Sequence, residues 1–508
     1  MALARAAAGG GSRGTARDGG GARGRGRGRG RGGGRGRGRG RGRSRHRRSS
    51  GPPAERVKFT RALPPPEELS VAIIGGGAAG CACAAELARA GVAVALFDTG
   101  RHGVGGRLAT RAASDGSLPA GQAGAARAEV AADPALRFDH ACQLFAATGE
   151  AGRDGFQEAV ERWVDEGLVR QYDAGAVGCI SLPETRTDGG AAGKAEAGKE
   201  SAVRGVHDEP LEGTFYYGAG GMRSVAGAML EGYAEGEGAQ VSVVAPCWVG
   251  RMEATEAGWA LHGEGKARGT YDAVVISHNG KCANALLKPS GAPDTFELFR
   301  RLRLGPVWVA LVAFESGVEL AHGAGADGAG YEAAFVRGAQ ALGFAADQGS
   351  KIGGCEKGSS MWALYSRGDY AKKNKVPQER VSQSDADGVL ADLLSDFEVL
   401  AGGELPSVRY SFCQLWGAAL PLNATSEAEY ALDAPTRVAA CGDWLGGGAS
   451  VGDAWRSGRA AARALVALAE REAAGGAPSC DEQSVALGDT LRSVTADAAT
   501  LGLRGARG

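Results

Sequence analysis

A short apolar run opens the regularly patterned part of the chain. Leu69 to Ile74 ends in four consecutive apolar residues, which predict a strand buried on both faces of a parallel sheet. Three prolines, Pro64 to Pro66, precede it, and Cys81 to Ala90 has the composition of a helix that Gly91 ends. Val92 to Phe97 is a second apolar run. This order of strand, turn, helix and strand predicts the start of a doubly wound α/β domain.

Further apolar runs predict more strands. Leu304 to Phe314 contains the sequence VWVALVAF, and Met361 to Tyr365 is a shorter run of the same character, so both suit an antiparallel sheet. Gln240 to Val249 and Trp259 to Ser277 also have the composition of strands. Near the other end of the chain, Val438 to Cys441 is a short apolar strand, followed by a turn and a helical stretch from 450 to 467.

Glycines crowd the turn after the first strand. The spacing is Gly75-x-Gly77-x-x-Gly80, with Ala78 and Ala79 between the last two. Glycines there let the backbone approach a pyrophosphate, and the free N–H groups at the start of the helix favour its negative charge. Together with the flanking strands and helix, this spacing predicts a dinucleotide site.

An acidic residue follows the second strand. Asp98, with Thr99 beside it, stands 23 residues after Gly75, where a carboxylate can accept hydrogen bonds from ribose hydroxyls. The segment from Arg101 to Thr110 then includes Gly105, Gly106 and Arg107. Two adjacent glycines permit close backbone approach, and arginines can neutralise phosphate oxygens. The alternative for this segment is an exposed loop with two arginines.

These segments resemble the FAD-binding amine oxidase superfamily, which includes desaturases and protoporphyrinogen oxidases. Arg137 to Ala147, RFDHACQLFAA, is similar to the F-D-H-G-A-Q-Y-F segment of renalase-type flavoproteins, with Ala141-Cys142 in place of Gly-Ala. Gly218 to Leu230 and Ala440 to Leu465 resemble two further motifs of that type, although Gly452 stands where a Glu is usual. Val274 to Leu287 looks like the plant and algal branch.

The resemblance implies a non-covalently bound FAD. Asp443, next to Gly442, would accept hydrogen bonds from the ribityl chain, and the backbone near Val249 would touch the adenine. The helix that begins with Ser450, Val451 and Ala454 would face the flavin, where its dipole favours the anionic reduced form. The alternative is a strand, turn and helix that serve packing alone.

Three residues are candidates for a catalytic role. His140 and Gln143 belong to the FDHACQ segment, and Trp416 occupies a position where renalase-type proteins keep an aromatic residue near the flavin. His140 is equally open to a structural role as a hydrogen-bonded histidine, and Trp416 to a role in core packing.

The formal net charge of zero hides an asymmetry. Residues 1–50 carry sixteen arginines against the single acid Asp18, so the remaining chain is acidic, which excludes a basic body for nucleic acid. The Arg/Gly-rich arm has too little apolar surface to fold and is expected to be disordered. Three interpretations of it stay open: an organelle transit peptide, chloroplast included, an RNA-binding tail, or low complexity without a role.

Metal sites, a disulfide scaffold and membrane spans are not expected. The ten cysteines and seven histidines are scattered without metal-ligand spacing, so no metal site is predicted, and the cysteines suit reduced thiols. The chain has no run of about 20 apolar residues, so no membrane span is predicted and a soluble protein, cytoplasmic unless the arm targets an organelle, is expected.

The fold class predicted is α/β, with a Rossmann-like FAD-binding domain and an inserted antiparallel-sheet α+β substrate domain. The expected divisions are a disordered arm (1–68), three parts of the FAD-binding domain (69–136, 218–284 and 434–470), two parts of the substrate domain (137–217 and 285–433) and a tail (471–508).

The function predicted is that of an FAD-dependent oxidoreductase that accepts a hydride from a small electron-rich substrate and is reoxidised by O2. No second strand-turn-helix unit with a complete G-x-G-x-x-G spacing is found for a nicotinamide domain, which favours direct transfer from substrate to flavin. The renalase resemblance implies dihydronicotinamide isomers as substrates. Amine oxidation, pigment or terpenoid desaturation, and a non-catalytic FAD-bound or RNA-associated protein are the alternatives.

Overall fold

The computed structural model describes residues 54–119, 133–147, 155–182, 207–231, 241–278, 280–321, 330–353, 359–425, 428–447, 450–476 and 492–493. The chain divides into two units, Met1–Gly51 and Pro52–Gly508. The Arg/Gly-rich arm up to residue 53 lies outside the described residues, as do its three interpretations.

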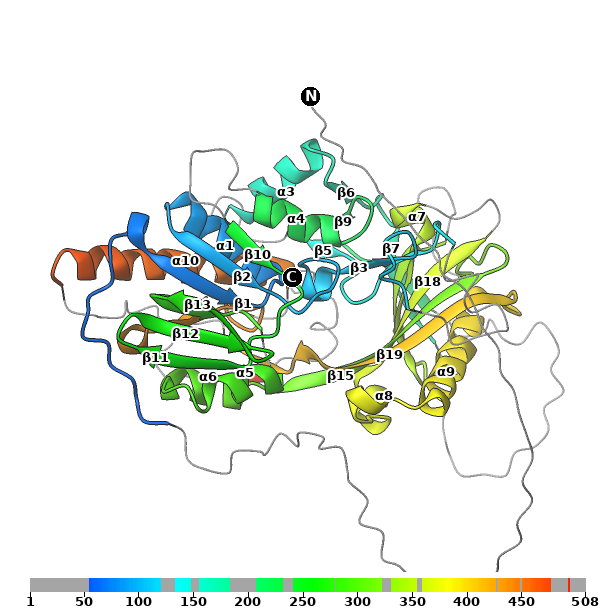
Figure 1. The fold of residues 1–508 in the computed structure, drawn as a ribbon. Coiled ribbons are helices and arrows are strands. Elements are labelled where there is room, and N and C mark those ends of the chain that lie inside the picture. The colour runs from blue at the N-terminus through cyan, green and yellow to red at the C-terminus, as the bar shows by residue number, and fades with distance from the viewer. Residues whose placement is uncertain are drawn as a thin grey trace, which may run out of the picture. The chain divides into compact units, whose positions relative to one another are not determined.

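A six-stranded sheet forms one half of the second unit (Figure 1). Its strands are parallel except for β21, which pairs antiparallel with β22. In sheet order they are β10 (Val241–Val244), β2 (Ala93–Phe97), β1 (Ser70–Ile74), β14 (Ala273–Ile276), β22 (Val438–Ala440) and β21 (Ala431–Asp433). Because β2 and β14 flank β1 on opposite sides, the strand order reverses at β1.

Successive residues of β1 enter two different cores, as the two-residue period of a strand requires. Val71 and Ile73 pack in the core that includes residues of α1 (Ala78–Arg89) and α10 (Val451–Ala473). Ala72 and Ile74 pack in the opposite core. That second core is closed by a three-stranded sheet and two helices: β11 (Arg251–Thr255), β12 (Gly258–Gly263), β13 (Lys266–Tyr271), α5 (Gly280–Leu287) and α6 (Pro293–Arg301).

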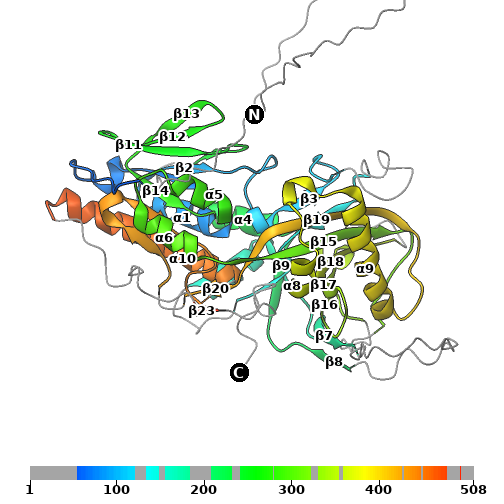
Figure 2. The same cartoon turned by 90° about the horizontal axis from the view of Figure 1, so that it is seen from below.

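A seven-stranded sheet forms the other half of the second unit (Figure 2). In order its strands are β19 (Val408–Pro421), β15 (Leu304–Phe314), β18 (Ser360–Ser366), β17 (Leu342–Asp347), β16 (Ala333–Arg337), β7 (Val177–Ser181) and β8 (His207–Pro210). All neighbours are antiparallel except β16 and β7. Helices α8 (Gly368–Lys373) and α9 (Gln383–Ala401) cover one face.

The remaining elements connect the two sheets. They are α3 (Phe156–Asp165), α4 (Arg223–Glu231), α7 (Gly349–Ile352), and the short strands β3 (Thr110–Ala112), β4 (Arg137–Asp139), β5 (Phe145–Ala146), β6 (Val169–Gln171), β9 (Phe215–Gly218), β20 (Asn423–Ala424) and β23 (Arg492–Ser493). Short 3-10 turns lie at Pro66–Glu68, Gly106–Leu108, Gln378–Arg380 and Ala434–Thr436. In the described part of the chain no helix is both long and apolar enough to cross a bilayer.

The predicted fold class is confirmed, with differences at two predicted strands. Of the strand predicted over Gln240 to Val249, the structure shows β10 at Val241–Val244, which ends before Pro246 because proline lacks the N–H that a ladder needs. Trp259 to Ser277 divides into three strands. Its first break is a tight hairpin in which Glu264 (φ 53°) and Gly265 (φ 76°) both adopt the positive φ of a two-residue turn.

The expectation of disorder throughout residues 1–68 is wrong for the last fifteen of them. Ala54 to Leu63, here called the N-terminal strap, packs against the six-stranded half. Arg56 donates to Asp433 at 2.8 Å and also pairs with Asp294. The backbone N–H of Leu63 donates to Glu472 at 2.7 Å. The Arg/Gly-rich pattern ends before residue 54. The strap therefore carries apolar side chains that can be buried.

Removal of the strap should destabilise the protein, whereas removal of the preceding arm should not. Deleting residues 1–63 leaves the largely buried carboxylates of Asp272, Asp433 and Glu472 without the partners that Arg61, Arg56 and Leu63 supply. A loss of about 2 kcal/mol or more lowers Tm by roughly 4 °C or more. Deletion of residues 1–53 is the matched control in thermal denaturation. Equal Tm values for the two truncated proteins would contradict this assignment.

Candidate functional site

A pocket opens at the carboxyl ends of β1 and β14, where the strand order reverses. Such reversals are the usual ligand sites of open α/β sheets. Its empty space, including the part open to solvent, is about 970 Å³. The lining residues are Gly77, Ala78, Ala79, Gly105, Arg107, Leu108, Ala141, Cys142, Ser277, His278, Val307, Val309, Tyr365, Trp416, Ala419, Leu420, Cys441, Gly442, Asp443, Trp444, Ser450, Val451 and Ala454.

The glycine turn shapes the floor of this pocket. Gly75 has φ +116°, which favours glycine, and a Cβ on Gly80 would lie 1.9 Å from the Gly75 oxygen. A Cβ on Gly77 would meet no atom of the described residues within 4 Å. Gly77 caps α1 without a side-chain hydrogen bond, so the N–H groups of the first helical turn remain available to a ligand. This geometry suits an anion.

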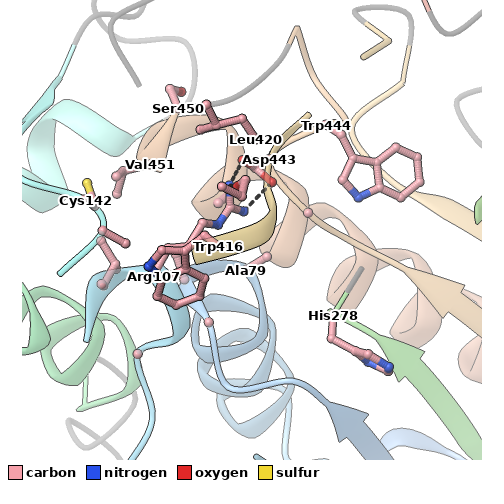
Figure 3. Close-up of a pocket in the computed structure, with 18 of the residues that line it drawn as sticks. Ala79, Arg107, Cys142, His278, Trp416, Leu420, Asp443, Trp444, Ser450 and Val451 are labelled. Atoms are coloured by element: carbon pink, nitrogen blue, oxygen red, sulfur yellow. Dashed lines mark hydrogen bonds and ion pairs between the residues drawn. The ribbon is translucent and has the colours of Figure 1, made fainter. Parts of the chain in front are cut away.

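Arg107 and Asp443 form a two-fold ion pair on the pocket wall (Figure 3). Both guanidinium Nη atoms lie 2.7 Å from Asp443 oxygens, and Nη1 also donates to the Ala419 carbonyl at 3.1 Å. The backbone N–H of Gly105 donates to the Gly76 oxygen at 2.7 Å, which fastens the segment of Arg107 to the glycine turn. Arg107 is therefore paired with a carboxylate at the site where the sequence predicted a phosphate ligand, and the pair offers the pocket both charges.

A second helix begins at the pocket. Ser450 accepts a hydrogen bond from the Asp453 N–H at 2.9 Å, and the Asp453 carboxylate accepts from the Ser450 N–H at 3.1 Å, so α10 starts with a capping box. The Ser457 hydroxyl accepts from the Gly442 N–H at 2.9 Å and ties the turn before Asp443 to the same helix. Two helix N-termini, those of α1 and α10, thus border one pocket.

The opposite wall comes from the seven-stranded sheet. Val309 pairs with Tyr365 on β18, and Val307 pairs with Trp416 on β19, so these four side chains lie on neighbouring strands at the pocket. The Trp416 indole N–H donates to the His140 carbonyl at 3.2 Å. An extended ligand with an anionic centre, hydroxyl groups and a flat apolar end fits these walls, because each of its parts meets the matching chemistry.

Comparisons with known proteins agree with this fold. A family model described as an NAD(P)-binding Rossmann-like domain matches residues 73–159. A candidate protoporphyrinogen oxidase from Exiguobacterium sp. 255-15 has a similar structure, with TM-score 0.51 and 11% identity, over 79% of this chain and 99% of that chain. This likeness shows the fold.

Two further solved structures are similar at lower scores. An oxidoreductase from Methanosarcina mazei has TM-score 0.49 and 12% identity, over 77% of this chain and 99% of that chain. A cyclohexylamine oxidase from Brevibacterium oxydans has TM-score 0.48 and 15% identity, over 79% of this chain and 100% of that chain.

The structure brings most of the predicted cofactor residues to one pocket. Those that line it are Gly77, Ala78, Ala79, Gly105, Arg107, Gly442, Asp443, Ser450, Val451 and Ala454, together with the catalytic candidate Trp416. Gly75, Gly80 and Gly106 do not line it but shape its glycine-rich side. Asp98, Thr99 and Val249 lie outside its lining, as do the other two catalytic candidates, His140 and Gln143.

Asp98 holds the backbone of the loops around it. Its two carboxylate oxygens accept from the Gly76 N–H at 2.7 Å and the Gly100 N–H at 2.6 Å. The Asp98 carbonyl accepts from the Cys247 N–H at 2.6 Å, which brings the segment of Val249 alongside. The Asp98 carboxylate, predicted at the ribose, therefore already has two backbone donors.

His140 is a buried neutral side chain. Burial, followed by the charge of Arg111, lowers its pKa to about 3, against a smaller opposing effect of its hydrogen bond to the Ala109 backbone. Its ring stacks on Trp416 with centroids 5.2 Å apart, so it supports the pocket from behind. A catalytic acid that titrates near neutral pH is not available at this position.

Sequence reasoning missed several lining residues. His278 and Ser277 follow β14, and the His278 Nδ1 lies 2.9 Å from the Ile74 carbonyl. Burial lowers the pKa of His278, which favours the neutral ring. Their position directly after a buried parallel strand was a usable signal. Tyr365 had no comparable signal, because the pairing of β15 and β18 decides where it faces.

Acidification should destabilise the protein partly through His140. Its folded-state pKa is lowered, so the unfolded state binds more protons between about pH 6.5 and pH 3, and stability falls as pH falls through this window. Between neutral pH and about pH 5 this loss amounts to ~2 kcal/mol. His140→Phe, which keeps a ring against Trp416, should lose about that much less in urea denaturation over the same range. Parallel pH profiles for the two proteins would refute this.

Proposed function

We propose that this protein is a renalase-like FAD-dependent oxidoreductase. It takes a hydride from a small electron-rich substrate held against the wall of the seven-stranded sheet. The observation that carries the proposal is the single pocket that joins the glycine turn, the Arg107–Asp443 pair, the start of α10 and the apolar wall of Val307 and Trp416.

Each part of that pocket has a role in the proposal. The N-terminus of α1 at Gly77 receives the diphosphate, since backbone N–H groups and the helix dipole favour negative charge. Asp443 accepts hydrogen bonds from the ribityl hydroxyls, and Arg107 holds this carboxylate in place. The first turn of α10, at Val451, faces the ring system. When bound, the flavin supplies the hydride acceptor and the route to O2.

The residues around the substrate exclude water. Val307, Val309, Trp416 and Leu420 present apolar surface on one side of the pocket. Exclusion of water strengthens the few polar contacts that orient a substrate, because the effective dielectric constant is low in a water-free pocket. The renalase-type segments, FDHACQLF above all, are what favour this subtype over other flavin oxidases.

Gly77→Val tests the cofactor assignment. The new side chain enters space that the protein itself leaves open, and Gly77 has an ordinary φ of −77°, so the variant should fold normally. It should lose bound FAD by at least about tenfold, equal to ~1.4 kcal/mol of steric overlap. The readouts are the flavin absorbance and native mass spectrometry. Gly388→Val, in open space on α9, is the control that should keep its flavin. Full flavin content in Gly77→Val would reject the proposal.

Anaerobic mixing with electron donors tests the activity. Dihydronicotinamide isomers should bleach the flavin absorbance, whereas simple primary amines and carotenoid precursors should not. The measurement is stopped-flow absorbance before and after O2 is admitted. Bleaching by amines alone would shift the assignment to an amine oxidase, and no bleaching by any donor would favour a non-catalytic flavoprotein.

A further inference from the structure

A buried polar network lies directly behind the pocket wall. It is called here the Lys351 network and consists of Asp139, Gln143, Gln348, Lys351 and Tyr365. Each of these residues is at most 2% exposed. Only Tyr365 also lines the pocket. The network therefore has one outlet toward a ligand, the tyrosine.

An ion pair fixes the inner end of the network. The Lys351 ammonium lies 2.7 Å from the Asp139 carboxylate, and both side chains are fully buried. The same ammonium donates to the Gln143 side-chain oxygen at 2.6 Å and to its carbonyl at 3.1 Å. An ammonium can only donate hydrogen bonds, so the atom of the Gln143 amide that faces Lys351 must be its oxygen.

The orientation of that amide decides the direction of the next hydrogen bond. The Gln348 amide also donates to the Gln143 oxygen, at 2.8 Å, so two donors hold this oxygen in place. The Gln143 NH2 group must then face the other way, where it donates to the Tyr365 hydroxyl and, at 2.6 Å, to the Asp139 carbonyl. The Tyr365 oxygen is therefore an acceptor toward the protein.

The hydroxyl hydrogen of Tyr365 remains to be donated. In the part of the chain that the structure describes, Gln143 is the sole hydrogen-bond partner of this hydroxyl. A buried O–H without an acceptor is costly, at about 1–3 kcal/mol. A ligand in the pocket that offers an oxygen or nitrogen lone pair removes this cost, and a ligand that offers only N–H donors does not.

We propose that the Lys351 network sets Tyr365 as a hydrogen-bond donor into the pocket, so that the site selects substrates with a neutral acceptor such as a carboxamide oxygen over protonated amines. Tyr365 touches the substrate, whereas Gln143 and Lys351 are positioning residues. The inference rests on the proposed function for the meaning of "substrate", and it names the chemical class which that site accepts.

The energetic cost of burying two charges supports a role for the Lys351–Asp139 pair beyond packing. Replacing a buried ion pair by apolar residues of similar volume is often neutral or stabilising, so stability alone does not explain the Lys351–Asp139 pair. The hydrogen-bonded members of a buried network instead enforce one geometry, as Lys351 and Gln348 do here on Gln143. Here the geometry enforced is the direction of the amide of Gln143.

The test uses two ligands of similar size that share a phenyl ring, benzamide and benzylamine, with the flavin-loaded full-length protein. Near neutral pH the first offers a carbonyl oxygen and the second an ammonium. Isothermal titration calorimetry measures both dissociation constants without relying on catalysis. The wild-type protein should bind benzamide more tightly. Equal or tighter binding of benzylamine, or binding of neither ligand, would overturn the inference.

Two substitutions separate selection from general packing. Tyr365→Phe should weaken benzamide binding by about 3- to 10-fold, the effect of one hydrogen bond, and leave benzylamine unchanged. Gln143→Glu places an acceptor before the tyrosine, turns its proton inward and should reverse the preference toward benzylamine. Equal losses for both ligands in Tyr365→Phe would indicate a packing role and reject the inference, even where Gln143→Glu fails to fold.

A matched control removes another buried tyrosine hydroxyl. Tyr410 lies on β19, donates to the Pro119 carbonyl at 3.0 Å and does not line the pocket, so Tyr410→Phe should change neither dissociation constant. A benzamide loss in Tyr410→Phe as large as in Tyr365→Phe would refute a specific contact. A wild-type protein that lacks flavin but prefers benzamide would overturn the proposed function and leave this inference standing.

Discussion

Close backbone packing around α1 is the constraint on which the site depends. On one side, a Cβ on Gly80 would stand 1.9 Å from the Gly75 oxygen, and on the other, a Cβ on Gly458 would stand 2.1 Å from the Ala79 oxygen. The helix is therefore held between the glycine turn and α10 with no room for a single methyl group at either contact. Because α10 lies so close, its own N-terminus reaches the pocket that α1 already borders.

The alternation of residues along two strands then gives the pocket its contrasting walls. In β1, Val71 and Ile73 face the helical core while Ala72 and Ile74 face the opposite one, so both faces of the six-stranded sheet are covered. In β15, Val307 and Val309 face the pocket, whereas Trp308 and Ala310 pack in the core that includes α9. The pocket therefore lies between one apolar wall and one polar, glycine-rich wall. Among the described residues, no buried face of either sheet is left uncovered.

The part of the site that could be predicted from the sequence is the part made by local spacing. Gly77, Gly105 and Asp443 each belong to a turn whose conformation is set by neighbours in the chain, and all three line the pocket. Tyr365 comes from a distant segment that only the pairing of β18 with β15 brings to the site. Gln143 and Tyr365, for example, are 222 residues apart in the sequence. The strap was missed because residues 1–68 carry two different compositions in succession, and the strap was grouped with the Arg/Gly-rich arm.

The charges of the Arg107–Asp443 pair face the pocket, whereas those of the Lys351 network do not. Arg107 and Asp443 line the pocket, where a ligand can share their hydrogen bonds. Lys351 and Asp139 neutralise each other out of reach of any ligand, and only the orientation of the Gln143 amide is transmitted outward. A hydroxyl directed in this way keeps its orientation before a substrate arrives, so little conformational freedom is lost on binding. Selectivity at this pocket would then arise from the direction of one hydrogen bond, set by a charge that the substrate never meets.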